Sequence, residues 1–581
     1  MTHARRAALT LLSALAFGSA SRAEAQQQPS LPQTWQEQQN FRSGPTPYEP
    51  LMRFWHELDA MSPLVSMQPL TQTLQGRAMT MAIIAEPAIT NPQDALRSGK
   101  TIVLLAPSVH GGEVSPKEAV QLIAKELVGG ELRPLLRDVI VLAIPLINPD
   151  GGEVRRRTNE AGYDMNRDYV KLESQEIQAL VTQVMNEWTP DIHVDGHHGG
   201  SAPYVITYQA TLNPAADSAL RAYPYDHIFP MIRNAVRAED YAAFDYSGVR
   251  TENGVRGWGS TSVEARKHHV YTGLTNSIGI LLETPSNSHR VMRDGTIREI
   301  PQVERYFHQV RGGVLAMRAI IRAASEQRPA IRAVTTGARL RAVEAGSRGG
   351  DPIVLDYEIG SRGTEGVWMP DANAASGYTL SQVPVYLKWN TTRTTPRPVG
   401  YLLPPSMAAV VPILQDHDIA VYRVRDSAQV NAEVYYATSV NRDTYFEGHY
   451  LKSVEVEKES EQLALSEGWF WVPTAQSRAN LISYLLEPET DDNLITWGWA
   501  DHLLQVRPRT VEEGMAALAA SMDLDLAAMS AEQQAQMRTR VERQLAGRQR
   551  VPMMRVMSHQ PIRAMQVQSP TAYQRNRFFN P

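Results

Sequence analysis

Four apolar runs divide the first 330 residues of the chain, and each has the length of a buried strand. They are TIVLLAPSV (101–109), DVIVLAIPLI (138–147), PDIHVDGH (190–197) and SIGILLET (277–284). Helical patterns such as SPKEAVQLIAKELV and ESQEIQALVTQVMNEW separate some of these runs. Strands that are apolar on both faces and alternate with helices indicate an α/β fold. We expect a mixed, largely parallel sheet that is covered by helices on both faces.

The pattern changes after about residue 328. Short β-like segments such as DPIVLDYEI, VPVYLKW and AEVYYAT follow one another, divided by Gly, Pro and Asn. Farther on, VEEGMAALAASMDLDLAAMSAEQQAQMRTRVERQLAG has a helical pattern, and we assign its Met residues to packing. The expected order is therefore an α/β domain at 45–328, a β-rich C-terminal region at 331–510 and a helical tail at 511–581.

The first residues have the pattern of an export signal. Arg5 and Arg6 precede the apolar run AALTLLSALAFG, and Ala23-Glu24-Ala25 closes the segment. A positive start, a short apolar core and a small-x-small exit predict a Sec-type signal peptide at 1–25. An apolar run of about 12 residues is too short for a ~30 Å hydrocarbon core, so we expect no membrane span. The polar residues 26–44 are expected to form a flexible lead-in, and the protein to be secreted or periplasmic in a bacterium.

Composition narrows the possible chemistry. The chain has 581 residues, a formal net charge of -5 and no cysteine. A nearly balanced charge does not suggest a nucleic-acid partner, which normally requires a basic face or stripe. The absence of thiols means that any metal must be held by His, Asp or Glu side chains.

Polar side chains that could bind a ligand or transfer a proton lie at or just after the end of each of the four predicted strands. These residues are His110, Asn148–Asp150, His197 and Glu283. Ligands of parallel sheets gather at the carboxyl ends of the strands, so we expect these side chains to lie close together. In HGGE (110–113) the two glycines allow a tight turn, on which His110 and Glu113 could converge on one ion. A catalytic zinc site of the His₂Glu type needs one more histidine.

The segment PDIHVDGHHGG offers three histidines. Strand alternation places His193, Asp195 and His197 on one face and His198 on the other. His197 is nearest the carboxyl end, whereas His193 lies about 13 Å farther back at roughly 3.3 Å per residue. We therefore choose His197 as the third ligand and assign His198 either to the rim or to a position behind a ligand.

A polar stretch after the second strand carries candidates for binding an anion. It reads NPDGGEVRRRTNEAGYDMNRDY (148–169) and includes three consecutive arginines. A run of arginines usually lies on a solvated face. The Asn166–Arg167 pair, however, combines an amide with a guanidinium, and a guanidinium binds a substrate carboxylate through two hydrogen bonds.

With these motifs in place, the chain resembles the zinc carboxypeptidase family M14, the carboxypeptidase A-like enzymes. The resemblance covers roughly residues 45 to 325. It is carried by motifs in the family's order, namely HGGE, NPDGG, Arg157–Asn159 as R-x-N, GYDMNRD, DGHH and LLET. A segment at VPTAQSRANLISYLLEPETDDNLITWGW also resembles the C-terminal extensions of large bacterial M14-like proteins.

The resemblance implies one zinc ion (Zn²⁺) per chain. His110, Glu113 and His197 would be its ligands, and Asp164 would orient the first histidine. Glu283 would be the general base that activates water at the zinc, whose charge lowers the pKa of that water toward ~7.

The resemblance also implies the groups that contact substrate. Arg157 would stabilise the oxyanion, with Arg155 or Arg156 as alternatives if the register differs. Asn166 and Arg167 would hold the free C-terminal carboxylate of a peptide. The family's capping tyrosine is assigned to Tyr271, which lies only 12 residues before Glu283, and Tyr246 is the alternative.

The expected activity is that of a secreted zinc metallocarboxypeptidase. One alternative is a zinc amidase of the same fold that acts on cell-wall peptides or acyl-amino acids. A second alternative is a binding protein that has lost catalysis on an M14 scaffold, although all the expected ligands and the base are present.

Overall fold

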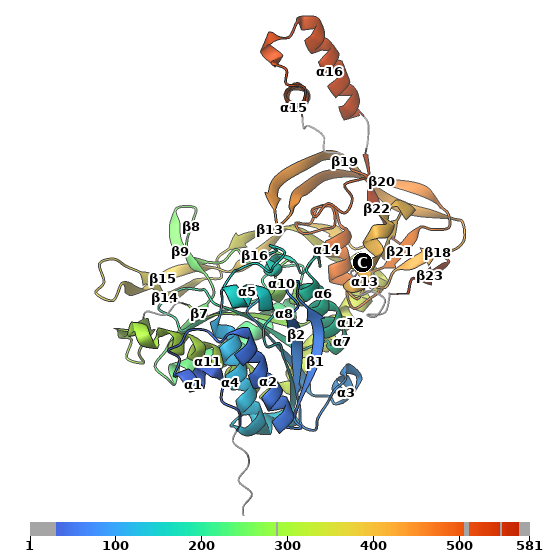
Figure 1. Ribbon diagram of the computed structural model, residues 1–581. Helices are drawn as coiled ribbons and strands as arrows, with labels where there is room; N and C mark the ends of the chain where they lie inside the picture. The colour runs from blue at the N-terminus through green and yellow to red at the C-terminus, as the bar shows by residue number, and fades with distance from the viewer. Residues whose placement is uncertain (1–30, 286–288, 505–509, 547–548, 569–581) are drawn as a thin grey trace, which may run out of the picture.

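The computed structural model describes residues 31–285, 289–504, 510–546 and 549–568 (Figure 1). The predicted signal peptide at 1–25 lies outside the described residues. Within these ranges the chain forms an α/β domain, which carries the motifs, and a C-terminal region, which we define as the residues from 349 onward.

A mixed eight-stranded sheet forms the centre of the α/β domain. Its strand order is β1-β2-β4-β3-β5-β10-β6-β7. The four strands predicted from sequence are its parallel centre, from β4 to β10, and the remaining four continue it on both sides. In chain order the strands are β1 (Val65–Gln72), β2 (Ala78–Ile84), β3 (Thr101–Pro107), β4 (Val139–Ala143), β5 (Ile192–His197), β6 (Ile206–Ala210), β7 (Ala243–Asp245) and β10 (Ile278–Glu283).

Helices cover one face of this sheet. They bury their apolar sides against strand residues such as Val103, Leu105 and Val194. The helices of this layer are α2 (Tyr48–Met61), α4 (Ser115–Gly129), α9 (Phe229–Arg237) and α11 (Arg305–Glu326). The prediction of a helical layer on this face is confirmed.

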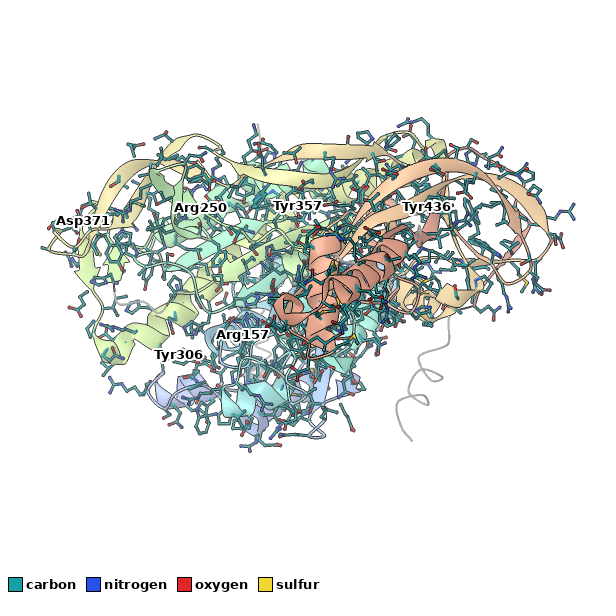
Figure 2. All side chains as sticks on the ribbon, turned by 90° about the horizontal axis from the view of Figure 1, so that it is seen from above. Arg157, Arg250, Tyr306, Tyr357, Asp371 and Tyr436 are labelled. Atoms are coloured by element: carbon teal, nitrogen blue, oxygen red, sulfur yellow. The ribbon has the colours of Figure 1, made fainter. Side chains whose placement is uncertain are left out.

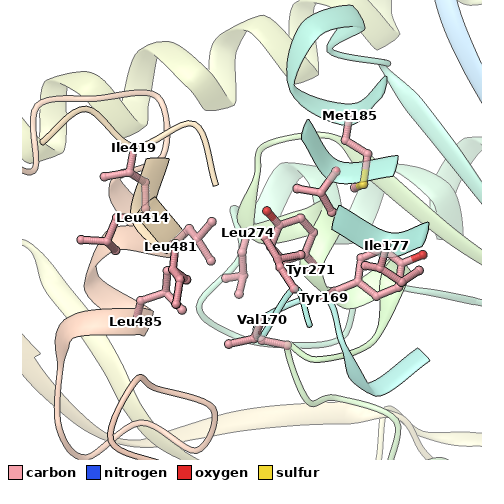
Figure 3. Close-up of a cluster of buried hydrophobic side chains, with 14 of the residues drawn as sticks. Tyr169, Val170, Ile177, Met185, Tyr271, Leu274, Leu414, Ile419, Leu481 and Leu485 are labelled. Carbon is pink, nitrogen blue, oxygen red and sulfur yellow. The ribbon is translucent and has the colours of Figure 1, made fainter. Parts of the chain in front are cut away.

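The opposite face is covered by helices and by the C-terminal region together. The helical segment α6 (Gln175–Ala179), η3 (Leu180–Met185) and α7 (Asn186–Trp188) lies on this side, with α10 (His268–Leu274). Figure 3 shows Tyr169, Val170, Tyr271 and Leu274 of the α/β domain beside Leu414, Ile419, Leu481 and Leu485 of the C-terminal region. The two parts of the chain therefore share one hydrophobic core.

The C-terminal region is β-rich, as predicted. Its largest sheet has seven strands in the order β20-β19-β22-β17-β21-β18-β23. A second sheet, with the strand order β14-β15-β9-β8, joins the C-terminal region to the α/β domain. In this sheet β15 pairs in parallel with β9 at Val385 and Trp258. Strands β8 (Gly248–Glu252) and β9 (Val255–Gly259) belong to the α/β domain. The strands of the C-terminal region are β13 (Pro352–Gly360), β14 (Thr364–Pro370), β15 (Tyr378–Tyr386), β16 (Lys388–Pro396), β17 (Gly400–Leu403), β18 (Tyr422–Val424), β19 (Ala428–Phe446), β20 (His449–Leu465), β21 (Phe470–Pro473), β22 (Gln549–Val556) and β23 (Ala564–Gln566).

The boundary predicted at 328–331 is replaced by a long helix. Helix α12 (Arg328–Arg348) follows α11 almost without interruption, and strands begin only at β13. The buried positions of α12 include Ile331, Thr335, Ala338 and Ala342, a spacing of three to four residues that selects a helix. The hydroxyl of Thr335 donates to Asp191, at the start of β5. Among the described residues, no helix has both the length and the apolarity needed to cross a bilayer.

The tail is helical only in part. Helices α15 (Val511–Ser521) and α16 (Ala531–Ala546) project from the C-terminal sheet, and their Met515 and Met537 pack together (Figure 1). The chain then returns as β22 and β23. Strand β22 reads QRVPMMRV and inserts between β19 and β17, so burial on both sides makes it a strand.

Part of the expected lead-in is ordered. Thr34 caps α1 (Trp35–Gln39), and Glu37 completes a reciprocal capping box. The Glu37 carboxylate accepts from Lys125 at 2.6 Å, which ties this helix to α4. Residues 31–44 are therefore not a flexible linker, while residues 26–30 lie outside the described residues.

Candidate functional site

The candidate site lies at the carboxyl ends of β3, β5 and β10. His110 follows β3, and Glu283 and His197 are register partners at the ends of β10 and β5. The side chains border a cavity of about 550 Å³. Its lining includes His110, Glu113, Arg157, Asn166, Arg167, His197, His198, Tyr246, Ser260, Ser262, Lys267 and Glu283. The strand ends thus bring together most of the residues selected from sequence.

Three of these side chains are arranged as ligands for one metal ion. Nδ1 of His110 lies 2.6 Å from Oε1 of Glu113, and Nδ1 of His197 lies 2.7 Å from Oε2 of the same carboxylate. The ligand atoms of the three residues all lie within 4.8 Å of one another. Two imidazole nitrogens and one carboxylate are the donor set of a catalytic His₂Glu zinc site.

Buried aspartates hold the far side of both rings. Nε2 of His110 lies 2.9 Å from Asp164, and Nε2 of His197 lies 2.9 Å from Asp195. An N–H on Nε2 that donates to a carboxylate leaves Nδ1 free to bind a metal, which is the usual arrangement for metal-bound histidine. The residues present therefore fit a zinc ion. The contact of Asp164 was expected, whereas that of Asp195 was not.

The buried charged side chains of the site shift one another's pKa values. Burial alone would raise the pKa of Glu113, yet His197 and His110 hold that pKa well below its ordinary value. Burial alone would lower the pKa of His197, but the carboxylates of Asp195 and Glu113 raise it well above its ordinary value. Two carboxylates facing each ring favour positive charge at the centre of the site.

Glycines permit the close packing behind the ligands. A Cβ at Gly111 would lie 2.0 Å from the backbone carbon of Gly151, so HGGE and NPDGG can pass each other only as glycine turns. A Cβ at Gly199 would lie 2.6 Å from Oε2 of Glu283. The glycine after the two histidines therefore makes room for the predicted base.

Glu283 stands at the inner wall of the cavity. Burial raises the pKa of Glu283 to about 8; attraction to His197 opposes this rise, and repulsion from Glu113 and Asp195 adds to it. A carboxyl group whose pKa lies in this range can exchange a proton with a reacting group near neutral pH. A bound cation would lower this pKa by favouring the carboxylate.

Among the three consecutive arginines, Arg157 is the one that lines the cavity. Its Nε donates to Asp164 at 2.9 Å, and its Nη1 lies 3.4 Å from Glu113. The side chain is 50% exposed, which leaves part of the guanidinium open to the cavity. Figure 2 labels Arg157 among the other side chains. Arg156 instead pairs with Glu160, and Arg155 ends helix α5 (Pro149–Val154) in a left-handed conformation.

Arg167 has a free guanidinium face, whereas Asn166 is largely committed to the protein. Nη1 of Arg167 donates to the carbonyl of Asn166, and among the described residues no carboxylate forms an ion pair with Arg167. Oδ1 of Asn166 accepts from the backbone N–H of His268, and its Nδ2 lies 3.1 Å from Nε2 of His197. Of this pair, Arg167 is the better placed to bind an anion.

The assignment of Tyr271 to the substrate is wrong. Tyr271 is fully buried on α10, and its hydroxyl donates to His417 in the shared core. The alternative residue, Tyr246, lines the cavity between β7 and β8. Burial raises the pKa of Tyr246 to about 12, and repulsion from Glu283 and Glu113 adds to the effect. The spacing of only 12 residues between Tyr271 and Glu283, shorter than in the family, also counts against Tyr271.

The other two histidines of this strand do not face Glu113 as ring ligands. His193 is buried behind the site, where its Nδ1 lies 3.4 Å from Nε2 of His268. His198 lies on the rim, as expected, and its backbone N–H donates to Glu113. The geometry thus agrees with the choice of His197.

Sequence reasoning missed part of the cavity wall. Residues between 246 and 262 contribute a polar rim that includes Ser247, Ser260 and Ser262. Lys267 also lines the cavity, and its Nζ donates to Glu264 at 2.7 Å. Small polar residues in loops carry no periodic or motif signal, so the sequence offered no means of finding them.

The sequence is similar to those of known carboxypeptidases. Residues 51–229 match the model of the family described as zinc carboxypeptidase, Peptidase_M14. Carboxypeptidase 2 of Trichophyton tonsurans is 23% identical over 429 residues, which cover 69% of this chain and 74% of the fungal protein.

Solved structures include similar chains. A metallo-carboxypeptidase from Pseudomonas aeruginosa is 19% identical, with a TM-score of 0.37 over 48% of this chain and 70% of that one. A metallo-carboxypeptidase from Burkholderia cenocepacia is 19% identical, with a TM-score of 0.37 over 49% of this chain and 70% of that one.

Proposed function

Because the chain carries a domain of the zinc carboxypeptidase family, Peptidase_M14, in residues 51–229, we propose that it is a zinc-dependent carboxypeptidase that removes residues from the free C-terminus of peptides. The observation that carries the proposal is the pair of rings at the strand ends. His110 and His197 turn their Nδ1 atoms toward Glu113, while Asp164 and Asp195 hold their Nε2 atoms.

A zinc ion held by these three side chains would supply Lewis-acid chemistry, lowering the pKa of water and polarising a carbonyl group. Glu283 takes the proton from the attacking water and returns it to the leaving amine. Arg157 donates hydrogen bonds to the carbonyl oxygen as negative charge develops there. Tyr246, between β7 and β8, lines the same cavity and is available to contact the substrate.

Arg167 determines that the peptide is cleaved at its C-terminal end. Its guanidinium lines the cavity without a carboxylate partner among the described residues, so a substrate carboxylate can pair with it. A charge-assisted contact of this kind is stronger than a neutral hydrogen bond. The scissile bond is then the one next to the terminal carboxylate, because Arg157 and Glu283 border the same cavity.

We extend the proposal to export through the Sec-type signal at 1–25 and action outside the cytoplasm. The motivation is the sequence pattern, with Arg5 and Arg6 ahead of the apolar run and Ala25 at its exit. Cell fractionation followed by N-terminal sequencing of the mature protein tests this. A mature chain that retains its first 25 residues in the cytoplasm would contradict it.

The decisive experiment compares a peptide acid with its C-terminal amide. We expect the acid to be cleaved one residue at a time and the amide far more slowly. Loss of a buried charge-assisted contact commonly costs ~2–5 kcal/mol, which corresponds to roughly 30-fold to several-thousand-fold in kcat/KM. Arg167→Ala should remove most of this preference and retain zinc.

The matched control is Arg156→Ala, which removes a neighbouring arginine that pairs with Glu160 on the surface. This variant should keep the acid preference. Equal rates on acid and amide in the parent enzyme, or internal cleavage of a capped peptide, would favour an amidase or an endopeptidase. D-amino-acid stem peptides in the same assay would identify a cell-wall amidase.

A further inference from the structure

The C-terminal region reaches the metal centre through the tip of one hairpin. Strands β19 and β20 are joined by a turn whose outer pair is Phe446 and His449, and we call residues 446–449 the hairpin tip. Oε2 of Glu447 accepts a hydrogen bond of 3.0 Å from the backbone N–H of Asp164. A residue of the C-terminal region thus contacts the aspartate that orients His110.

Asp164 joins several parts of the site. Its Oδ1 lies 2.9 Å from Nε2 of His110 and accepts from the backbone N–H of Asn166 at 3.0 Å. Its Oδ2 accepts from Nε of Arg157 at 2.9 Å. Each of these contacts depends on the position of the Asp164 backbone, and the Glu447 carboxylate is hydrogen-bonded to that backbone.

The turn itself disfavours glutamate at this position. Glu447 has φ 48° and Gly448 has φ 85°, the left-handed pair of a two-residue hairpin turn. Asn-Gly is the preferred sequence for such a turn, because asparagine tolerates positive φ better than residues with longer side chains. Residues held in sparsely populated conformations cluster at functional sites. The glutamate therefore serves its side-chain contact and not the turn.

The hairpin tip also contacts the α/β domain through groups other than the Glu447 carboxylate. The carbonyl oxygen of Glu447 accepts from Nζ of Lys171 at 3.3 Å. Nε2 of His449 lies 2.8 Å from Glu173, and the Arg266 guanidinium lies 5.2 Å from the centre of the Phe446 ring. These contacts remain when the side chain of residue 447 changes. Docking of the tip and the bond to Asp164 are separable.

We propose that Glu447 is a positioning residue for the metal centre, which fixes the backbone of Asp164 and through it the orientation of His110 and Arg157. The inference rests on the proposed function in one respect, namely that the centre binds zinc. Glu447 itself touches neither the ion nor the substrate. The C-terminal region is then part of the site's support, although none of its described residues lines the cavity.

The test compares two substitutions in the full-length protein that separate the side-chain contact from the turn. Glu447→Gln keeps the length and an oxygen acceptor for the N–H of Asp164. Glu447→Asn suits the turn better but is one methylene shorter and withdraws the acceptor. His449→Ala is the matched control, because it removes a neighbouring tip contact that leads to Glu173 and not to Asp164.

Zinc affinity is measured by competition with a chelator, together with thermal unfolding. Loss of a group directly behind a ligand typically weakens metal binding 10–100-fold, so we expect about 3- to 10-fold for Glu447→Asn, one bond farther away. Its melting temperature should equal or exceed that of the parent. Glu447→Gln and His449→Ala should bind zinc within about twofold of the parent.

Several results would overturn the proposal. Parent-like zinc affinity in Glu447→Asn would do so, as would equal weakening in His449→Ala, which would indicate general loosening of the tip. Equal weakening in Glu447→Gln would show that the acceptor oxygen is not what matters. If Glu447→Asn does not fold, Glu447→Gly takes its place, since glycine also suits the turn.

A readout without zinc distinguishes this proposal from the proposed function. Amide hydrogen exchange of the segment 163–168 should be faster in Glu447→Asn than in the parent and in His449→Ala. If the parent binds zinc but cleaves no peptide, the proposed reaction fails while the role of Glu447 is still decided by affinity and exchange. Unchanged exchange in Glu447→Asn would refute the positioning role whether or not the enzyme is active.

Discussion

The hydroxyl of Tyr271 donates a hydrogen bond to Nδ1 of His417, 2.8 Å away, across the boundary between the α/β domain and the C-terminal region. Nε2 of His417 lies 3.1 Å from the carbonyl oxygen of Val170, so this nitrogen carries the proton. The ring is fully buried and neutral, because burial lowers the pKa of His417 to about 4 even though the Val170 contact opposes the shift.

This pair predicts a loss of stability at mildly acidic pH. The folded pKa of about 4 lies below the unfolded value of ~6.5, so between these values the unfolded chain binds a proton that the folded chain refuses. Stability is therefore full above pH 6.5 and falls as the pH falls toward 4. Between pH 7 and pH 5 the contribution amounts to about 2 kcal/mol.

Urea unfolding of the parent and of His417→Gln at pH 7, 6 and 5 measures this effect. The variant should be less stable than the parent at pH 7 and should lose less stability on acidification. Parallel curves for the two proteins would mean that His417 does not titrate differently in the folded and unfolded states.

A second prediction concerns Glu283, the register partner of His197. Glu283→Gln keeps the size of the side chain and removes its basicity, so zinc content and folding should persist. General-base catalysis typically contributes 10²–10⁴-fold, and we expect kcat to fall by at least the lower figure. Turnover within about tenfold of the parent, measured on a protein with full zinc, would assign the proton transfer to another carboxylate.

A third prediction concerns Asp195, which holds Nε2 of His197 from a fully buried position. Asp195→Asn should weaken zinc binding 10–100-fold, as is usual when the carboxylate behind a metal-bound histidine is replaced. Asp191→Asn is the control, because Asp191 is also buried but lies at the opposite end of β5 and accepts from Thr335. Equal zinc affinities in the two variants would refute a specific role of Asp195.

A fourth prediction concerns a chain that ends at residue 349. Such a fragment keeps the motifs but exposes the apolar face on which Tyr169, Val170 and Leu274 meet the C-terminal region (Figure 3). Each large side chain that loses its cover forfeits ~1.5–3 kcal/mol. We expect an aggregated or loosely packed product that binds a hydrophobic dye, in contrast to the full-length protein. A soluble fragment that unfolds cooperatively would show that the α/β domain is self-sufficient.

The sequence predicted the centre of the fold well, for a physical reason. Strands buried on both faces are apolar without interruption, so β3, β4, β5 and β10 stand out from their surroundings. Their carboxyl ends then bring His110, His197 and Glu283 to one edge of the sheet, where the cavity lies.

The features that the sequence did not predict depend on distant partners. Strand β22 follows two helices and pairs with β17 and β19, more than 100 residues earlier, so nothing local marks it. The assignment of Tyr271 rests on the family resemblance alone, whereas α10 turns this residue into the shared core. In contrast, the capping box of Thr34 and Glu37 was readable as T-x-x-E and was overlooked.

The register of β5 against β10 fixes one part of the site independently of the other. Main-chain hydrogen bonds of the sheet set the separation of His197 and Glu283, so the reacting groups keep their spacing whatever the loops do. The polar rim at 246–262 belongs instead to β8, β9 and their flanks, outside that ladder. The reacting side chains therefore keep their spacing through the central sheet, whereas the rim keeps its place through the pairing of β9 with β15 of the C-terminal region.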